Sequence, residues 1–230
     1  MRQATGGDVL RVARWKGDPT IALLTTIPGR PRPLREELAR SLERVAAEGY
    51  HAVLTGAVEV AEAGVYLDTG FEERARLHVL GRPLDDLPAS TGAYEFHRAR
   101  RRDRAQVHAV DRAGFGEFWQ LDAGGIDDAI NATPEAHFRV ARREAVIAYA
   151  ICGRAGHQGY VQRLAVHPDH RRAGIGRELV VDGLHWMRRR GARDALVNTQ
   201  IENDDALALY ESLGFRRRGL GLCVLGRSLS

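Results

Sequence analysis

The sequence predicts an α/β chain, and three observations carry that prediction. Short apolar runs typical of strands alternate with segments whose apolar residues have helical spacing, most clearly between residues 159 and 215. The 230 residues exceed one ordinary domain of roughly 100–200 residues and fall short of two. Two stretches of the chain also repeat one pattern. Together these features indicate one complete unit preceded by a partial copy.

The composition is that of a folded protein, with 44% hydrophobic and 28% charged residues. No run approaches the 18 apolar residues of a membrane span, and the first eight residues contain no apolar segment of a secretory signal. We therefore expect a cytoplasmic protein without a membrane partner. Cys152 and Cys223 form no CxxC pair and no Cys/His cluster, so we expect buried thiols, no disulfide scaffold and no metal site.

The boundary between the two units is predicted at residues 81–92 (GRPLDDLPASTG), where glycines and prolines interrupt any regular period. The two units are then residues 1–90 and 93–230. Elements expected in the second unit are strands at 94–100, 137–141, 145–152, 159–166, 195–199, 215–217 and 221–226, and helices at 103–111, 115–132, 206–213 and from the glycine loop 167–174 to Gly191.

The internal repeat is clearest in two short segments. Residues 65–71 (VYLDTGF) mirror residues 209–215 (LYESLGF), and each is followed by the sequence VLGR. Upstream, both copies have a proline-bearing loop (Pro28 against Pro168), a helix ending at a glycine (Gly49 against Gly191) and an apolar strand (52–54 against 195–197). Residues 1–90 therefore resemble the second half of the C-terminal unit without its opening strand and helices.

The motif that carries chemistry is a glycine-bearing turn between a strand and a helix. The strand 160–166 (YVQRLAV) leads through residues 167–170 (HPDH) into residues 171–176 (RRAGIG). Such a turn directs unpaired N–H groups and the positive end of the helix dipole outward, which suits a pyrophosphate. Arg171 and Arg172 add positive charge there. The pattern is neither GxxxxGK[ST] nor GxGxxG.

The motifs follow one order along the chain: strand, R-x-x-G-x-G, helix, strand, asparagine and L-Y-x-x-x-G-F. In this order the chain resembles the GCN5-related N-acetyltransferase (GNAT) family over residues 93–230, most specifically over 160–215. The resemblance implies a mixed, mostly antiparallel sheet flanked by helices, with acetyl-CoA between two strands that splay apart. It further implies that Asn203 touches the cofactor arm. The implied contacts of the pantetheine are Leu164, Ala165 and Val166, and those of the pyrophosphate are Arg171, Arg172, Ala173, Gly174, Ile175, Gly176 and Arg177.

Tyr210 matches the family tyrosine near the thioester sulfur, which implies the role of general acid. When an amine attacks the acetyl carbonyl, a thiolate is expelled, and a positioned hydroxyl can protonate it. Members that acetylate ribosomal proteins carry a glutamate where this chain has Asn198, which cannot act as a base. Proton removal is then left to a water chain or to a residue such as His137, Tyr160 or Gln200.

The N-terminal copy lacks the phosphate cradle. Opposite the glycine turn it has the sequence GRPRP, in which Pro31 and Pro33 have no N–H to donate. We therefore expect residues 1–90 to be a degenerate partial domain that does not bind acetyl-CoA, although Tyr66 aligns with Tyr210 in the repeat. We expect it to pack on the C-terminal sheet, as the partner domain does in tandem family members.

The distribution of charge favours an anionic ligand in the second unit. Residues 1–92 contain 12 basic and 13 acidic side chains, and residues 93–230 contain 22 and 17. The run 98–104 (RARRRDR) has no interleaved aromatic residues and the net charge is only +4, so we expect no nucleic-acid partner. The leading hypothesis is an acetyl-CoA-dependent N-acetyltransferase that transfers directly to an amine of a small molecule or peptide, as a monomer or homodimer. The alternative is an acyl-CoA-binding regulatory protein without turnover.

Overall fold

The computed structural model describes residues 9–27 and 29–229. Pro28, which the repeat places opposite Pro168, lies outside them, as do the first eight residues. The chain forms two compact units: the first consists of the residues up to Val79 together with Gln200–Glu202 and the residues from Arg218 on, and the second consists of Leu80–Thr199 and Asn203–Arg217. These units do not coincide with the ranges 1–90 and 93–230, because each includes a segment from beyond the predicted boundary.

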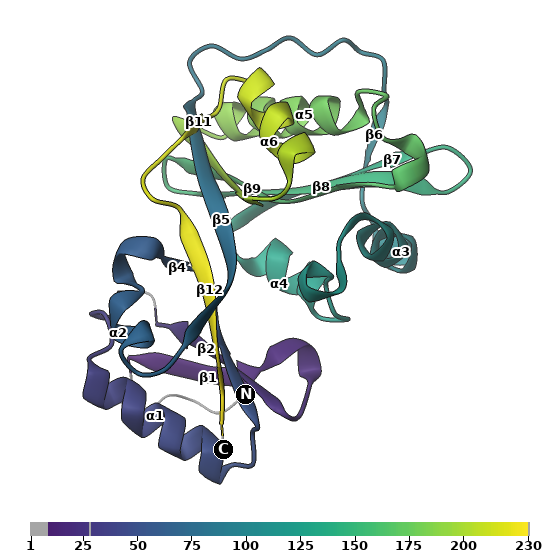
Figure 1. The fold of residues 1–230 in the computed structure, drawn as a ribbon. Coiled ribbons are helices and arrows are strands. Elements are labelled where there is room, and N and C mark those ends of the chain that lie inside the picture. The colour runs from purple at the N-terminus through teal and green to yellow at the C-terminus, as the bar shows by residue number, and fades with distance from the viewer. Residues whose placement is uncertain (1–8, 28, 230) are drawn as a thin grey trace. The chain divides into compact units, whose positions relative to one another are not determined.

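The first unit is a sheet with the strand order β1-β2-β3-β12-β5, and α1 packs against it (Figure 1). Strands β1 and β2 are antiparallel, β2 and β3 are parallel, and β12 runs antiparallel to β3 and β5. The elements are β1 (Leu10–Arg14), β2 (Ile21–Thr26), α1 (Arg35–Ala47), β3 (Ala52–Thr55), β4 (Val58–Glu59), α2 (Gly64–Leu67), β5 (Glu72–Pro83, of which 72–79 belong here) and β12 (Leu222–Ser228).

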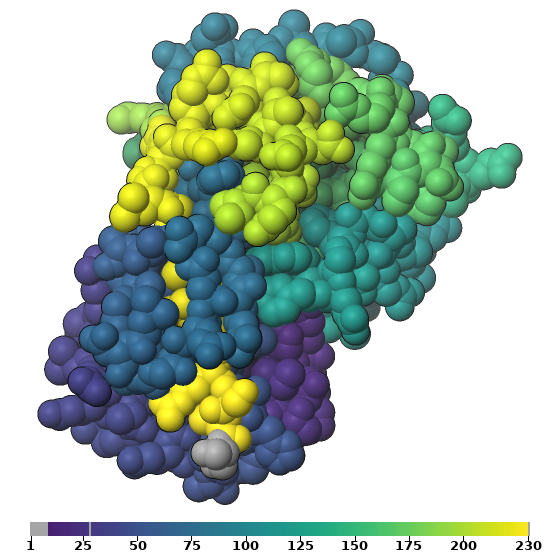
Figure 2. Space-filling model, in the orientation of Figure 1, coloured from purple at the N-terminus to yellow at the C-terminus, as the bar shows by residue number. Residues whose placement is uncertain are grey.

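Strand β12 corrects the prediction that residues 221–226 complete the second unit. The C-terminal strand instead lies between β3 and β5, and its side chains Cys223 and Leu225 are buried in the core of the first unit with Leu24 and Phe71. Figure 2 shows this segment, in yellow, inserted among residues of the N-terminal part of the chain. An apolar strand has no local sequence signal for which strands it pairs with, because packing against distant segments decides its neighbours.

The second unit is a mixed, mostly antiparallel sheet. Its strands follow the order β10-β9-β8-β7-β6, in which β9 and β10 are parallel and every other neighbouring pair is antiparallel. Leu80 and Gly81 of β5 pair with β11. The remaining elements are β6 (Phe96–Arg98), α3 (Arg104–Gly114), a 3-10 turn (Glu117–Trp119), α4 (Gly125–Asn131), β7 (Glu135–Arg142), β8 (Val146–Ala155), β9 (Gln158–Val166), α5 (Ile175–Arg189), β10 (Asp194–Gln200), α6 (Asp204–Ser212) and β11 (Arg216–Arg217).

Helices cover both faces of this sheet. Helices α5 and α6 lie on one face, and α3 and α4 on the other (Figure 1). Two apolar clusters fill the first interface, with Leu184 and Phe215 among the fully buried side chains. A separate cluster around Ile126 and Tyr149 fills the second. Within the part of the chain that the structure describes, no helix combines the length and apolarity that a membrane crossing requires.

Two of the predicted elements are wrong. The helix expected over 115–132 is a short 3-10 turn followed by α4, because glycines at 116, 124 and 125 interrupt the helical spacing. Side chains of α3 and β9, Asp111 and Arg163, hold the turn by hydrogen bonds to its backbone. The linker expected over 81–92 begins only after Pro83, since β5 continues through Gly81 and Arg82, which are both buried. Strand β6 is also shorter than the predicted 94–100.

Candidate functional site

The parallel strands β9 and β10 separate in the middle of the sheet of the second unit. Their ladder joins Gln158–Val161 to Asp194–Val197 and ends at the pair Val161↔Val197, although β9 continues to Val166. Leu164, Ala165 and Val166 therefore have β8 as partner on one side only. Apart from the Val166 carbonyl, which accepts from Arg171 Nε at 3.4 Å, the backbone groups on the other side of this segment can pair with an extended ligand in the manner of an added strand.

A β-bulge marks the point of separation. Ile151 of β8 pairs with Arg163 and Cys152 pairs with Val161, so Gln162 is the extra residue. A bulge bends its strand and increases its twist, which accounts for the departure of β9 from β10. In the sequence, two successive polar residues, Gln162 and Arg163, interrupt the alternation of the strand. That interruption is a signal that could have located the bulge.

The loop between β9 and α5 contains two residues in the left-handed region. Arg172 has φ = 61° and Gly174, the N-cap of α5, has φ = 82°. Left-handed geometry is costly for arginine, and such strain is concentrated at ligand sites. Alternating backbone conformations of this kind turn successive N–H groups toward one anion, and the first N–H groups of α5 have no intrahelical acceptor. The segment from Arg172 to Arg177 therefore has the geometry of a phosphate cradle.

Gly176 connects this cradle to the open strand and to α6. A Cβ atom at Gly176 would lie 3.5 Å from Val166, 3.9 Å from Leu164 and 3.6 Å from Leu209. The predicted pantetheine segment, the predicted phosphate loop and the helix that carries Tyr210 thus meet at one place. All of these residues belong to the second unit.

The arginines of the loop have protein partners. Arg171 donates from Nη2 to the carbonyl of Gly114 at 2.9 Å and from Nε to that of Val166 at 3.4 Å, so it ties the C-terminus of α3 to the end of β9. Arg172 forms an exposed ion pair with Asp205. Arg177 pairs with Glu178, whose buried carboxylate also accepts from the Ser90 hydroxyl and the Thr91 N–H. In the same loop, the Ala173 carbonyl accepts a hydrogen bond from the Tyr94 hydroxyl, and the side chain of Ile175 is buried in the core.

Tyr210 is 5% exposed and lies on α6, on the same face of the sheet as α5. Burial raises the pKa of Tyr210, and the thiol of Cys152 raises it further, while Arg163 lowers it. Cys152 and Arg163 both flank the bulge in the β8–β9 ladder. The phenol therefore stays protonated at neutral pH next to the point where β9 and β10 separate, as a general acid requires.

The other candidate residues have definite places. Asn203 is the N-cap of α6, and its side-chain oxygen accepts from the Ala206 N–H at 3.1 Å. Asn198 is exposed on β10, one residue beyond the end of the ladder. His137 is engaged on the α5 face, where Nε2 lies 2.8 Å from Asp182 and the ring stacks on Trp186. That pairing makes His137 a weak candidate for the base. Gln200 groups with the first unit.

A cluster of charged side chains that the sequence reasoning missed lies on the α3 face. Arg163 forms an ion pair with the fully buried Asp111 at 2.7 Å, donates to the carbonyl of Trp119, and stacks on the ring of Phe115. Asp111 also accepts from the Tyr149 hydroxyl and from the Leu121 N–H. The cluster fixes the turn between α3 and α4 beside the bulge. No local pattern indicates it, since its members come from three separate elements.

The first unit also has a pair of neighbouring parallel strands, β2 and β3, but these strands do not separate as β9 and β10 do. Its ladder between β2 and β3 runs from Ile21↔Ala52 to Leu24↔Thr55, and the Gly56 N–H then donates to the Leu24 carbonyl at 2.8 Å. A Cβ atom at Gly56 would lie 3.2 Å from Thr25. The two strands therefore stay together for almost the whole length of β2.

Comparison with known proteins agrees with this geometry. Residues 95–215, more than half of the chain, match the family model described as Acetyltransferase (GNAT) family. N-alpha-acetyltransferase 30 of Schizosaccharomyces pombe is 31% identical over 93 residues, which cover 38% of this chain and 62% of that protein. Mycothiol acetyltransferase of Rhodococcus jostii is 41% identical over 59 residues, covering 26% and 19%. The chain thus spans less than two thirds of the length of these curated relatives.

Two solved structures have the same fold. A tandem GNAT protein from the clavulanic acid biosynthesis pathway has a TM-score of 0.70 at 16% identity, covering 95% of this chain and 78% of that chain. A GCN5-related N-acetyltransferase from Sphaerobacter thermophilus has a TM-score of 0.64 at 13% identity, covering 95% and 76%. The match of the second unit to the family model and the mixed sheet with helices on both faces lead to one conclusion: the chain belongs to the GNAT acetyltransferase family.

Proposed function

We propose that this protein is an acetyl-CoA-dependent N-acetyltransferase that transfers the acetyl group directly to an amine. One observation carries the proposal: the ladder between β9 and β10 ends at Val161↔Val197, and the open strand leads into a loop with two left-handed residues. An extended chain that ends in a pyrophosphate fits this combination, because one part pairs with a strand and the other binds N–H groups.

The donor would be held by three sets of groups. The backbone of Leu164, Ala165 and Val166 pairs with the pantetheine arm, and Asn203 contacts that arm from the start of α6. The N–H groups from Arg172 to Arg177 hold the pyrophosphate, including those of Ala173, Gly174, Ile175 and Gly176. Arg171 supports the loop through the carbonyls of Gly114 and Val166, in addition to its positive charge. The fit is supported by the packing of Gly176 against Leu164, Val166 and Leu209.

Acetyl-CoA supplies a thioester, in which the carbonyl carbon accepts a nucleophile and the thiolate leaves. The lone pair of the amine forms the new N–C bond, the C–S bond breaks, and Tyr210 donates its proton to the departing sulfur. The amine loses one proton to solvent, and the Tyr210 phenolate regains one from solvent. Cys152 forms no acetyl-enzyme in this scheme, because burial raises the pKa of its thiol to about 12 and leaves it a poor nucleophile.

Two measurements test the proposal. Acetyl-CoA should raise the melting temperature of the protein, since a ligand that binds only the folded state stabilises it. CoA release should then be measured with a panel of amines: a peptide with a free N-terminus, an aminoglycoside, a polyamine, an amino acid and an aminothiol. The names of the relatives make the peptide and the aminothiol the first choices. A thermal shift without CoA release for any amine would favour the regulatory acyl-CoA-binding protein.

We also propose that residues 1–90 are a degenerate partial copy of the catalytic unit that does not bind acetyl-CoA. The continuous ladder between β2 and β3 and the absence of N–H donors at Pro31 and Pro33 support this. Titration of acetyl-CoA should then give one binding site per chain, and a second site would contradict the proposal. A cytoplasmic location and a monomeric or homodimeric state stay predictions from the sequence.

A further inference from the structure

The first unit contains a cavity of about 300 Å³ between the start of α1 and α2, two helices that lie side by side (Figure 1). This volume is at the lower end of the range for small-molecule sites, roughly 300–1,000 Å³. The lining combines apolar side chains, Leu34 and Val65 among them, with the charged side chains of Arg32, Arg35 and Glu62. All lining residues belong to the first unit, so the cavity is a feature of that unit alone.

The hydroxyl of Tyr66 has no partner at this cavity. Tyr66 lines the cavity and is only 3% exposed, and its hydroxyl makes no hydrogen bond to any other described residue. The oxygen is not among the fully enclosed polar atoms, so it faces the space that Tyr66 lines. Burial and the charge of Glu62 raise the pKa of Tyr66 to about 12, so the hydroxyl keeps its proton at neutral pH. Because buried hydroxyls nearly always have a partner, this one needs an acceptor from outside the described residues.

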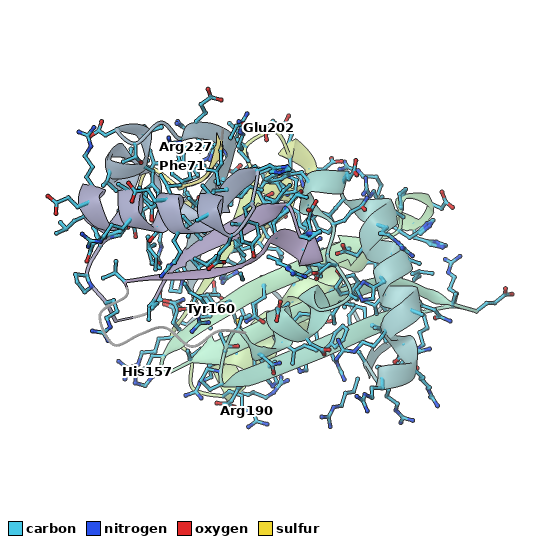
Figure 3. All side chains as sticks on the ribbon, turned by 90° about the horizontal axis from the view of Figure 1, so that it is seen from below. Phe71, His157, Tyr160, Arg190, Glu202 and Arg227 are labelled. Carbon is cyan, nitrogen blue, oxygen red and sulfur yellow. The ribbon has the colours of Figure 1, made fainter. Side chains whose placement is uncertain are left out.

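The ring of Tyr66 is held in place by its other contacts. Phe71 meets the ring edge to face, and the Phe71 N–H and the Thr69 hydroxyl both donate to the Tyr66 carbonyl. Arg227 of β12 donates to the Thr69 carbonyl, close to Phe71 (Figure 3). These contacts use the ring and the backbone of Tyr66, so they fix its position and leave its hydroxyl available.

One positive charge at the cavity is unpaired. Arg32 and Glu62 form an ion pair at 2.7 Å, so their charges offset each other. Arg35, the first residue of α1, has no carboxylate partner in the part of the chain that the structure describes. At the N-cap position, Leu34 offers no side-chain acceptor to the N–H groups of the first turn, and Glu37 is turned back to the Leu34 N–H at 2.8 Å. The start of α1 therefore has a positive potential that an anion would offset.

We propose that this cavity binds a small carboxylate with an apolar tail: the carboxylate accepts a hydrogen bond from Tyr66 and pairs with Arg35, and the tail packs on the apolar lining. A carboxylate has two acceptor oxygens and one charge, which match one hydroxyl and one guanidinium. Leu34 is 68% exposed, and a tail that covers it removes apolar surface from water. This site is separate from the proposed acetyl transfer and does not require it.

Other anions fit this cavity less well. Strands β2 and β3 stay together as far as Leu24↔Thr55, so the first unit has no open strand of this kind for a pantetheine arm. Pro31 and Pro33 have no N–H to donate to a pyrophosphate. Inorganic phosphate would neutralise the charge of Arg35 but would leave the apolar lining uncovered. The apolar side chains are thus what favours a carboxylic acid over phosphate or acetyl-CoA.

Titration calorimetry of the full chain with hexanoate is the first test, carried out with and without saturating CoA. We expect one hexanoate site per chain in both conditions, and weaker binding of hexylammonium and of inorganic phosphate. The inference is overturned if hexanoate does not bind at millimolar concentrations, or if hexylammonium or phosphate binds as tightly. Loss of hexanoate binding in the presence of CoA would also overturn it, because the hexanoate would then occupy the catalytic cleft.

Single substitutions locate the site. Tyr66→Phe and Arg35→Gln should each raise the Kd for hexanoate about tenfold, the effect of a lost hydrogen bond to a charged group. Tyr50→Phe and Arg40→Gln, the same changes elsewhere in the first unit, are the matched controls and should leave the Kd unchanged. A Kd that stays at the wild-type value in both Tyr66→Phe and Arg35→Gln would refute the site.

A crystal structure of the wild type with hexanoate does not depend on the stability of any variant. We expect a carboxylate oxygen within hydrogen-bond distance of the Tyr66 hydroxyl. Hexanoate bound only elsewhere, or a Tyr66 hydroxyl that donates to a group of the protein itself, would contradict the proposal. None of these measurements uses CoA release, so failure of the proposed function would leave their outcome unchanged, and failure of this site would leave the proposed function standing.

Discussion

The ring of Tyr210 meets the ring of Phe215 edge to face, with centroids 5.7 Å apart. Tyr66 and Phe71 repeat this contact at 5.6 Å in the first unit. In both units the phenylalanine N–H donates to the tyrosine carbonyl, and the glycine before it is left-handed, with φ = 82° at Gly214 and 83° at Gly70. The glycine cap at the end of the helix therefore positions the tyrosine, before any ligand is considered.

Removal of one hydroxyl tests the role of Tyr210. Tyr210→Phe should slow CoA release on the order of a hundredfold, since general acid catalysis contributes about 10²–10⁴. The thermal shift with acetyl-CoA should remain close to wild type, because the ring and its contact with Phe215 are kept. Tyr66→Phe is the matched control in the first unit and should not change the rate. An unchanged rate in Tyr210→Phe would show that Tyr210 is not the acid.

The left-handed cap of α5 can be tested with a small substitution. Gly174→Ala adds a Cβ atom with no other atom within 4 Å, so its effect comes from the backbone at φ = 82°. We expect a loss of stability of about 1–2 kcal/mol and a smaller thermal shift with acetyl-CoA. Gly156→Ala, also left-handed and uncrowded in the turn between β8 and β9, should lose stability and keep the shift. Equal shifts in both variants would argue against the phosphate cradle.

The end of β5 is expected to be essential for the second unit. Leu80 and Leu84 are fully buried in its core, and Arg82 donates to the carbonyls of Leu213 and Asp86. Burial of each leucine contributes roughly 1.5–3 kcal/mol. A fragment of residues 80–230 should therefore resist urea better than a fragment of residues 93–230. Coincident unfolding curves would refute this, and both fragments should be less stable than the whole chain.

Glu178 predicts a dependence of stability on pH. Burial raises the pKa of its carboxyl group, but hydrogen bonds from Ser90 and Thr91 and the charge of Arg177 outweigh burial and lower it below 4.5. A depressed pKa stabilises the folded state above the unfolded value, and this contribution is lost as the pH falls through the folded value. The free energy of unfolding of the wild type should thus exceed that of Glu178→Gln at neutral pH.

The difference between the wild type and Glu178→Gln should shrink as the pH falls below 4.5, the value of an ordinary glutamate. Urea titrations at a series of pH values measure it. Glu144→Gln, in the exposed turn before β8, is the control and should keep the pH dependence of the wild type. A gap between wild type and Glu178→Gln that is constant with pH would contradict the assignment.

Local patterns were enough to predict the elements near the glycine loop. The sequence predicts the strand to Val166, the turn, the helix to Gly191 and the helix with Tyr210, and the structure has these elements within a few residues. The reason is that caps and glycines act over short distances. The prediction of one helix over 115–132 was wrong, because the apolar spacing of this segment resembles that of a helix. Hydrogen bonds from Arg163 and to Asp111, which lie on other elements, hold the segment as a turn.

What the sequence could not predict depends on contacts between distant segments. The bulge at Gln162 and its hydrogen bond to Thr133 require β8 and the end of α4 to be in place. The partner of β12 was likewise assigned to the wrong unit. In both cases the local sequence is compatible with more than one neighbour, and packing decides between them.

The position of β12 between β3 and β5 also sets an order of events during synthesis. Residues 222–228 leave the ribosome after all residues of the second unit, and without them β3 and β5 have no common neighbour. The first unit, although most of it is translated first, therefore completes its sheet only after the second unit has been synthesised. Until then its apolar side chains, Leu24 and Phe71 among them, lack the cover that Cys223 and Leu225 provide.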